Sequence, residues 1–367
     1  MINSERYHRQ MILPGMGIEG QQKLSNAKVL VIGAGGLGCP VLQYLAAAGT
    51  GKLGIVDDDL VSLSNLHRQV LYSVADIGKS KATSAASKLE ALNPDIEIIP
   101  YPFRLTNQNA LDTISGYDIV VDGSDNFGTR YMVNDACVIL GKPLVYGAIS
   151  KFEGQMTVFN MPGKDGQSGV NYRDLFPVPP GEMEVPNCED AGVLGVLPGI
   201  IGASMANEVL KIIIGFGVVS TGKLLTFNAL TNSTYEFILG DHSDDYIVPG
   251  NVDAFMQANY DWNCALPGAG EIAGKDFFKM LQNPGVMVID VRNRGELPIV
   301  SRFKHVNIPL DELADRATEF THAETLIFFC KSGQRSRQAA GLINEKFRDG
   351  KLIYSLRGGL NGLDQQL

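Results

Sequence analysis

The chain has 367 residues, of which 45% are hydrophobic and 19% charged, and its formal net charge is −9. This length allows two domains, and the composition is that of an ordinary globular protein. The acidic balance argues against a nucleic-acid surface, which normally carries a basic stripe. The apolar, uncharged stretch 191–207 is shorter than the roughly 20 residues that span a membrane, so we expect a buried or interface helix there and no membrane partner.

The first ten residues are polar and mixed in charge, unlike a signal peptide. Five cysteines are scattered along the chain, and no two have CxxC spacing. This argues against both a disulfide framework and a four-cysteine zinc site. We therefore expect a cytoplasmic protein. Cys39 and Cys137 lie in apolar helical contexts and are expected in the core.

Residues 1–240 alternate short apolar strands with helices. Strands are expected at 29–32, 53–56, 96–99 and 119–121, and helices at 37–48 and 81–92. This order predicts an α/β, Rossmann-like domain, with a mostly parallel sheet covered by helices on both faces.

The pattern changes after residue 240. Residues 241–269 are rich in Asp, Ser, Asn, Pro and Gly without a sustained apolar period, which indicates a linker. A second α/β pattern occupies 270–367, with strands expected at 286–290, 326–329 and 352–354 and a helix at 336–347. These roughly 100 residues are enough for one small domain.

A glycine-rich turn follows the first strand. Gly33-Ala-Gly35-Gly36-Leu-Gly38 has GxGxxG spacing and opens a helix, where backbone N–H groups can bind phosphates. Asp57 ends the next strand and is placed to accept a ribose hydroxyl. Alone, this fingerprint is also typical of an NAD-dependent oxidoreductase, which remains the alternative.

Charged side chains favour a different chemistry. The stretch from Asp57 to Gln69 combines acids, an amide and an arginine; Lys81 follows, and the strand at 119–121 is succeeded by Asp125-Asn126. Hydride transfer needs no such cluster. Attack of a carboxylate on the α-phosphate of ATP does, because cations must neutralise the phosphates and a carboxylate must hold Mg²⁺.

With these motifs in order, residues 4–240 resemble the MoeB/ThiF branch of ubiquitin-activating-enzyme relatives, which adenylate ubiquitin-like sulfur carriers. The resemblance implies that Asp125 holds Mg²⁺ and that Arg9, Arg68 and Lys81 contact the phosphates of ATP. It also implies a homodimer in which Arg9 acts on the partner's site. The implied Mg-ATP residues, besides the four glycines, are Asp57, Asp59, Ser64, Asn65, Leu66, His67, Arg68, Gln69, Lys81, Asp125 and Asn126.

The chain departs from this family at its usual zinc site. Asn171 and Asp174 stand where one pair of cysteines would be, and only Cys264 follows residue 239 in the region of the second pair. A tetrahedral sulfur site cannot be built from these residues, so no zinc is expected. Cys188 lies where some relatives keep a cysteine that forms a thioester or acyl disulfide; other relatives adenylate without one, and its role stays open.

Cys330 ends the strand at 326–329 and precedes a helix. A cysteine there lies in a ring of backbone N–H groups that stabilises a thiolate or persulfide, and Arg335 adds a cation at the rim. Four residues separate Cys330 from Arg335, whereas a CxxxxxR phosphatase needs five. The segment from about Gly270 to the end of the chain resembles the rhodanese family, which implies a persulfide on Cys330. The loop residues are Lys331, Ser332, Gly333, Gln334 and Arg335.

Together the two halves predict an enzyme that adenylates the C-terminal glycine of a ubiquitin-like sulfur carrier with Mg-ATP and then forms a thiocarboxylate. Expected partners are the carrier and a sulfur donor such as a cysteine desulfurase. The sequence leaves open whether the carrier belongs to a molybdopterin or a thiamine type of pathway. A non-catalytic scaffold that binds ubiquitin-like proteins is a further alternative.

Overall fold

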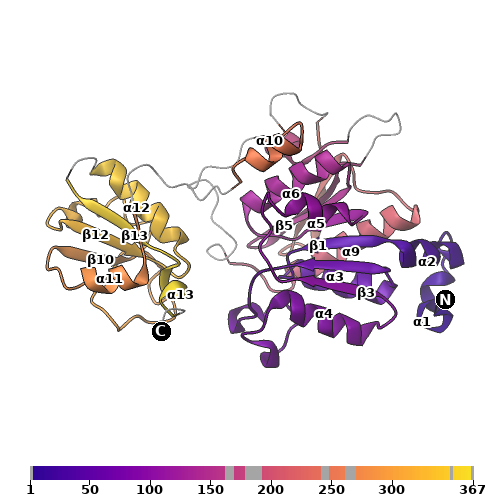
Figure 1. The fold of residues 1–367 in the computed structure, drawn as a ribbon, viewed down its shortest axis with the longest axis horizontal. Helices are drawn as coiled ribbons and strands as arrows, with labels where there is room; N and C mark the ends of the chain where they lie inside the picture. Colours follow the sequence, from indigo (N-terminus) through magenta and orange to yellow (C-terminus); the bar gives the residue numbers. More distant parts are fainter. Residues whose placement is uncertain are drawn as a thin grey trace. The chain divides into compact units, whose positions relative to one another are not determined.

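The computed structural model describes residues 3–161, 169–177, 192–240, 248–260, 270–347 and 350–364. The described residues form two compact units, one up to residue 260 and the other from residue 270 (Figure 1). Both units are α/β, as the sequence predicts.

An eight-stranded sheet forms the centre of the described first unit, in the order β3-β2-β1-β4-β5-β6-β7-β8. The strands from β3 to β5 are parallel, and β6, β7 and β8 are antiparallel to their neighbours. The strands are β1 (Lys28–Ile32), β2 (Lys52–Val56), β3 (Glu97–Tyr101), β4 (Ile119–Asp122), β5 (Leu144–Ser150), β6 (Glu153–Phe159), β7 (Lys223–Asn228) and β8 (Ser233–Ile238).

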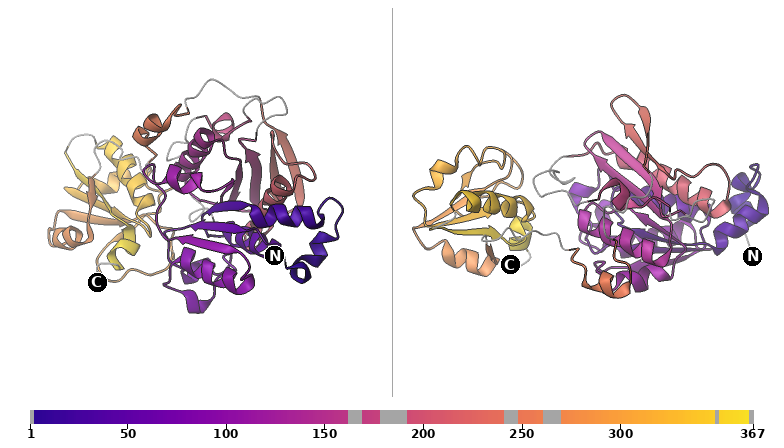
Figure 2. Two further views of the ribbon diagram at one scale, coloured as in Figure 1. Left: turned by 45° about the vertical axis from the view of Figure 1, so that its right-hand side comes forward. Right: turned by 90° about the horizontal axis from the view of Figure 1, so that it is seen from above.

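Helices cover both faces of this sheet (Figure 1). They are α1 (Ser4–Met11), α2 (Gly17–Asn26), α3 (Gly38–Ala48), α4 (Lys81–Leu92), α5 (Ala110–Ser115), α6 (Phe127–Leu140), α7 (Tyr172–Leu175), α9 (Leu197–Ile214) and α10 (Val252–Gln257), with short 3-10 turns at Leu63–Asn65 and Val74–Asp76. Figure 2 shows α1 and α2, in indigo, together at one side of the unit, where α2 packs on α9.

Alternation along β1 explains the two layers. Val29 and Val31 pack with α3, α4 and α9, whereas Leu30 and Ile32 pack with α5 and α6. Successive side chains of a strand point to opposite faces, so a strand covered on both sides is apolar throughout. The mostly parallel sheet predicted from these apolar runs is confirmed.

Among the helices that the structure describes, α9 is long and apolar enough to cross a membrane by length and composition alone. In the fold it packs against α3 and the strands β5 and β6, and half of it is buried. Cys39 and Cys137 are both fully buried, as expected, and burial raises the pKa of the Cys39 thiol to about 12.

Part of the predicted 241–269 linker is folded onto the first unit. α10 lies within it, Phe255 is buried in the core beside α6, and the Tyr260 hydroxyl donates to Asp135 across 2.8 Å. A six-residue helix is too short to show an apolar period, and its clearest signal is the cap at Asn251, whose side chain accepts from Ala254 N at 2.9 Å.

The second unit has a five-stranded parallel sheet in the order β11-β10-β12-β13-β9. α12 covers one face, and α11 and α13 cover the other. The elements are β9 (Gly270–Ile272), α11 (Gly274–Met280), β10 (Val286–Asp290), β11 (Val306–Asn307), a 3-10 turn at Ala317–Phe320, β12 (Thr325–Phe329), α12 (Gln334–Lys346), β13 (Leu352–Leu356) and α13 (Gly359–Asp364).

Candidate active sites

The glycine-rich turn connects β1 to α3 at the edge where the parallel strands end. Gly33 has φ +88°, and a Cβ there would lie 2.9 Å from the Gly123 carbonyl oxygen. A Cβ on Gly38 would lie 1.8 Å from the Gly33 carbonyl oxygen. Both positions therefore require glycine, and they bring the start of α3 against the sheet edge. The free N–H groups at this helix start are suited to bind phosphate.

Asp57 holds this turn from the end of β2. One carboxylate oxygen accepts from Ala34 N at 2.8 Å, and the other accepts from Asp59 N at 2.9 Å. Burial raises the pKa of Asp57, although Lys81 and the two N–H groups act in the opposite direction. Asp57 is thus a structural partner of the glycine turn as well as a lining residue of the pocket.

Lys81, the first residue of α4, reaches into the same pocket. Its Nζ donates to the Asp59 carboxylate at 2.8 Å. Burial acts to lower the pKa of Lys81, but the negative charges of Asp57 and Asp59 outweigh it and raise that pKa overall. The pocket therefore contains a charged ammonium group near the glycine turn, where a triphosphate would lie.

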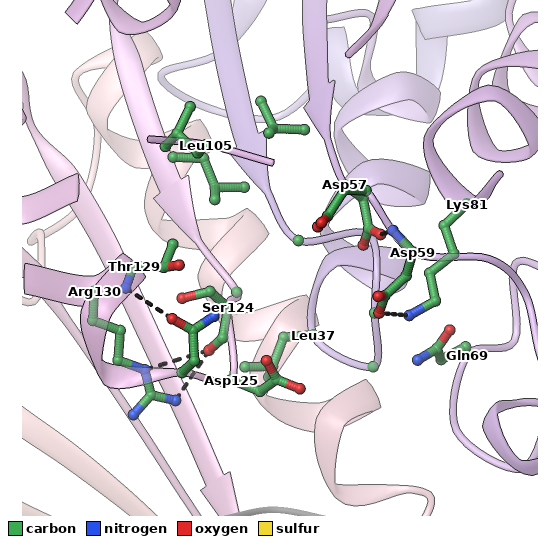
Figure 3. Close-up of a pocket in the computed structure, with 18 of the residues that line it drawn as sticks. Leu37, Asp57, Asp59, Gln69, Lys81, Leu105, Ser124, Asp125, Thr129 and Arg130 are labelled. Atoms are coloured by element: carbon green, nitrogen blue, oxygen red, sulfur yellow. Dashed lines mark hydrogen bonds and ion pairs between the residues drawn. The ribbon is translucent and has the colours of Figure 1, made fainter. Parts of the chain in front are cut away.

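The opposite wall comes from the end of β4 and the start of α6. Figure 3 shows Ser124, Asp125 and Arg130 across the pocket from Asp57 and Lys81. Asn126 caps α6, since its side chain accepts from Thr129 N at 2.8 Å. This leaves Asp125 exposed in the cavity beside the helix start.

Together these walls enclose a cavity of about 340 Å³. Of the predicted Mg-ATP residues, it is lined by Gly33, Gly35, Gly36, Asp57, Asp59, Arg68, Gln69, Lys81, Asp125 and Asn126. The other predicted residues do not line it: Gly38 is the first residue of α3, and Ser64, Asn65, Leu66 and His67 lie in the turn after β2. Arg9 is exposed on α1 and does not line it either. Cys188 lies outside the described residues.

The Arg68 guanidinium is positioned by its own turn. It donates to the Ser64 carbonyl at 3.2 Å and lies 2.7 Å from the His67 ring nitrogen Nε2. Burial and the charge of Arg68 lower the pKa of His67, which favours the neutral ring. Ser64 and His67 therefore act on the pocket through Arg68.

One buried polar atom in the cavity wall, Gln69 Oε1, has no hydrogen-bond partner among the described residues. Buried polar groups are normally hydrogen-bonded, so this oxygen can contact a bound ligand. This atom, the glycine turn, Lys81 and Asp125 form a donor and acceptor set that fits a magnesium nucleotide. Part of the remaining lining is apolar, with Ile32, Val56, Phe103 and Leu105.

Arg130 is the main site residue left outside the predicted set. It lies buried one helical turn after Asn126, with its guanidinium 5.4 and 5.6 Å from the Phe127 and Tyr146 ring centroids. Its Nη2 donates to the Ser124 carbonyl at 3.0 Å. The spacing from Asn126 was the available signal, but only the tertiary structure shows the aromatic residues that hold it at the pocket.

Asn171 and Asp174, where the family resemblance leads us to expect cysteines, both have side chains that are used locally. Asn171 accepts from Arg173 N at 2.9 Å, and Asp174 accepts from Asn171 N at 2.7 Å, which caps α7. Arg173 forms a buried ion pair with Asp135 at 2.6 Å. Among the described residues no group of three or more His, Cys, Asp or Glu side chains could hold a metal.

In the second unit, Cys330 follows β12 and its side chain is fully buried. The Gly333 N–H donates to Cys330 Sγ at 3.1 Å, and α12 begins one residue later. A thiol at the N-terminal end of a helix, with a backbone N–H directed at it, is suited to carry negative charge.

The first carbonyl groups of this loop accept hydrogen bonds from backbone N–H groups of α13. Leu360 N donates to the Cys330 carbonyl at 2.9 Å, and Asn361 N donates to the Lys331 carbonyl at 3.0 Å. A Cβ on Gly359 would lie 2.4 Å from the Cys330 carbonyl oxygen, so only glycine allows α13 to approach this closely. With its carbonyls held by α13, the loop can direct its N–H groups at the sulfur.

Arg335 is not an isolated cation at the rim. Its two terminal nitrogens each lie 2.8 Å from an oxygen of Glu296. Burial acts to raise the pKa of Glu296, but the bonds and charge of Arg335 outweigh it and lower that pKa overall. The predicted rim charge is therefore balanced by a carboxylate, and the pair fixes the start of α12.

Each of the two units matches one family model. The ThiF family model matches residues 7–246, and the rhodanese-like domain model matches residues 274–366. The chain belongs to the ThiF family. It also carries a rhodanese-like domain, and the two predicted resemblances are confirmed.

Relatives that match nearly the whole chain have names that combine the two activities. The chain is 40% identical over 368 residues to "Probable adenylyltransferase/sulfurtransferase MoeZ" of Mycobacterium tuberculosis, covering 99% of this chain and 93% of that one. It is 40% identical over 385 residues to "Adenylyltransferase and sulfurtransferase MOCS3" of Drosophila grimshawi, covering 99% and 84%. This member of the ThiF family is an adenylyltransferase and sulfurtransferase, and the oxidoreductase alternative is not favoured.

Two further matches concern the first unit. A "Sulfur carrier protein adenylyltransferase" of Thermus thermophilus is 56% identical over 229 residues, which cover 62% of this chain and 84% of that one. The crystal structure of E. coli MccB with MccA-N7isoASN has a TM-score of 0.59 at 24% identity, covering 68% and 76% of the two chains. The MccB likeness supports the fold.

Proposed function

We propose that this enzyme adenylates the C-terminal glycine of a ubiquitin-like sulfur carrier and then converts it to a thiocarboxylate with sulfur from a Cys330 persulfide. The observation that carries the proposal is the presence, in one chain, of a Lys81–Asp59–Asp125 nucleotide pocket and a Cys330 loop at a helix start. The names of the relatives, which pair adenylyltransferase with sulfurtransferase, support it. We assign adenylation to residues 1–240 and sulfur transfer to 270–367.

In the first half-reaction the carrier's carboxylate attacks the α-phosphorus of ATP, giving an acyl-adenylate and pyrophosphate. Lys81 and Arg68 would contact the phosphates, and the glycine turn would bind them through backbone N–H groups. Asp125 would hold Mg²⁺, which neutralises phosphate charge when bound. Asp57 would accept a ribose hydroxyl while it keeps the turn in place.

In the second half-reaction the Cys330 persulfide anion attacks the activated carbonyl. This forms an acyl disulfide and releases AMP. A second thiolate then attacks the Cys330 sulfur, which forms a protein disulfide and releases the carrier thiocarboxylate. Cys188 is our candidate for that thiol, and a cellular thiol would reduce the disulfide before the next cycle.

The remaining features belong to the same proposal. We infer a homodimer in which Arg9 serves the partner's pocket, since Arg9 does not line the pocket of its own chain. We propose a cytoplasmic enzyme that works without zinc, because Asn171 and Asp174 cap α7 instead of providing thiolates. Its sulfur donor would be a cysteine desulfurase, and its carrier would serve a molybdopterin or thiamine type of pathway.

Mass spectrometry of candidate carriers tests this function directly. Each carrier is incubated with the enzyme, Mg-ATP and a sulfur donor, and the intact mass is recorded. The expected product has one sulfur in place of one oxygen, and Cys330→Ser blocks it while leaving pyrophosphate exchange intact. Carrier-independent pyrophosphate exchange, or tight NAD binding with negligible ATP binding, would contradict the proposal. A non-catalytic scaffold would keep its cellular role after Asp125→Ala and Cys330→Ala.

A further inference from the structure

Two buried serines lie beside the Cys330 sulfur, and neither belongs to the loop predicted from the sequence. Ser336 is in the first turn of α12 and is 0% exposed; Ser355 is in β13 and is 1% exposed. Their hydroxyl oxygens are 2.9 Å apart. Both lie next to an apolar cluster that contains Phe328 and Ile353, where an unbonded hydroxyl is costly.

The two hydroxyls share their partners with the cysteine loop. Ser336 Oγ donates to the Gly333 carbonyl at 3.0 Å, and Ser355 Oγ lies 3.5 Å from the same oxygen. Cys330 Sγ lies 3.8 Å from Ser336 Oγ, within reach of a sulfur hydrogen bond. Gly333 N donates to the same sulfur at 3.1 Å.

These distances allow two complete hydrogen-bond arrangements, because a serine hydroxyl can rotate. With a neutral thiol, Cys330 S–H donates to Ser336, Ser336 donates to the Gly333 carbonyl, and Ser355 donates to Ser336. With a thiolate, Ser336 turns to donate to the sulfur and Ser355 replaces it at the Gly333 carbonyl. In both arrangements the Gly333 carbonyl keeps its backbone bond from Arg337 N at 3.2 Å, and one of the two serine hydroxyls is its side-chain donor.

We propose that Ser336 and Ser355 are positioning residues for sulfur transfer, which switch between these arrangements as Cys330 loses its proton. Ser336 supplies a second donor to the buried sulfur anion, and Ser355 acts through Ser336 by taking over the Gly333 carbonyl. The proton goes to solvent, and no oxidant or reductant is needed. This role rests on the sulfur-transfer half of the proposed function.

Loading from inorganic thiosulfate isolates this step from the carrier and from ATP. The Cys330 thiolate attacks the outer sulfur of thiosulfate, one S–S bond forms as another breaks, and sulfite leaves with the electron pair. The full-length enzyme is mixed with thiosulfate for a single turnover, and the peptide that contains Cys330 is followed by mass spectrometry for the gain of one sulfur. Melting temperature is recorded for every variant.

A matched control comes from the same strand that leads to Cys330. Thr325 is a buried hydroxyl residue at the opposite end of β12, so Thr325→Val removes a buried hydroxyl without touching the sulfur. We expect Ser336→Ala to slow loading about tenfold, as for loss of one hydrogen bond to a charged group, and Ser355→Ala to slow it roughly three- to fivefold. The double variant should be no slower than Ser336→Ala alone, and Thr325→Val should load at the wild-type rate.

The outcomes separate this role from the proposed function. If the wild type gains no sulfur on Cys330, both the sulfur-transfer half and this role fail. If the wild type loads but Ser336→Ala loads equally fast, only the serine role fails. Independent, multiplying effects of the two serine substitutions would also overturn it, because Ser355 would then not act through Ser336.

Discussion

The Lys81 ammonium group donates to the Asp59 carboxylate across 2.8 Å, with 7% of the Lys81 side chain exposed and 70% of that of Asp59. The lysine is therefore held inside the nucleotide pocket, while its partner is largely in water. An exposed carboxylate is a weak competitor for a triphosphate, so the pair orients Lys81 without blocking it.

Lys81→Ala should lower pyrophosphate exchange by about 100-fold or more, because a preorganised charge on the phosphates would be lost. Asp59→Asn should lower it less, about three- to tenfold, since Lys81 keeps its charge but loses its fixed position. Lys79→Ala, an exposed lysine in the same segment, is the control. Equal activity of Lys79→Ala and Lys81→Ala would show that Lys81 has no special role.

Asp125→Asn should raise the Mg²⁺ concentration needed for half-maximal pyrophosphate exchange by about tenfold or more, because a neutral amide is a poorer Mg²⁺ ligand than a carboxylate. A Mg²⁺ titration at saturating ATP measures this effect. Asp112→Asn on α5, also an exposed acid of the first unit, serves as the matched control. An unchanged Mg²⁺ requirement would remove Asp125 from the metal site.

Asp76 should contribute acid-sensitive stability. Hydrogen bonds from Lys88 and Ser73 lower the pKa of Asp76 from 3.8 to about 2. A lowered pKa means that the stabilisation is complete above pH 3.8 and is lost as the pH falls through about 2. We expect Asp76→Asn to cost about 1–2 kcal/mol at pH 7. Melting temperatures at several pH values should converge with the wild type in strong acid; a constant difference would contradict this origin.

Glu296→Gln should slow sulfur transfer about tenfold and leave adenylation unchanged, because Arg335 loses the carboxylate that fixes the start of α12. Separate assays of pyrophosphate exchange and thiosulfate loading distinguish the two activities. Glu312→Gln provides a matched control, since Glu312 pairs with Arg294 and Arg316 instead. A parallel loss of both activities would point to general unfolding.

Gly359→Ala should abolish sulfur transfer, because the new Cβ would press on the Cys330 carbonyl oxygen and separate α13 from the loop. Gly350→Ala is the control: Gly350 also has a positive φ, of +120°, but a Cβ there has no neighbour within 4 Å. Thiosulfate loading measures both variants. If Gly350→Ala were equally inactive, backbone strain alone would explain the loss.

Much of the architecture could be predicted from the sequence, because its signals are local. β1, β2 and β4 appear in the sequence as short apolar runs. The glycine turn after β1 appears as a motif of fixed spacing. The Cys330 loop is likewise contiguous. α10 escaped prediction, since six residues carry no period and Phe255 is buried only by its contacts with distant segments.

The candidate sites were likewise predictable in part from the sequence and in part only from the structure. By itself the sequence determined which residues we propose for the chemistry: Gly33, Lys81 and Asp125 for the nucleotide, and Cys330 for sulfur. Only the tertiary structure decided how they are held, because Glu296 meets Arg335, Ser355 meets Ser336, and Arg130 lies between aromatic rings from different elements. The contacts between different elements join residues that are not neighbours in the chain, and they form only when the sheets bring those elements together.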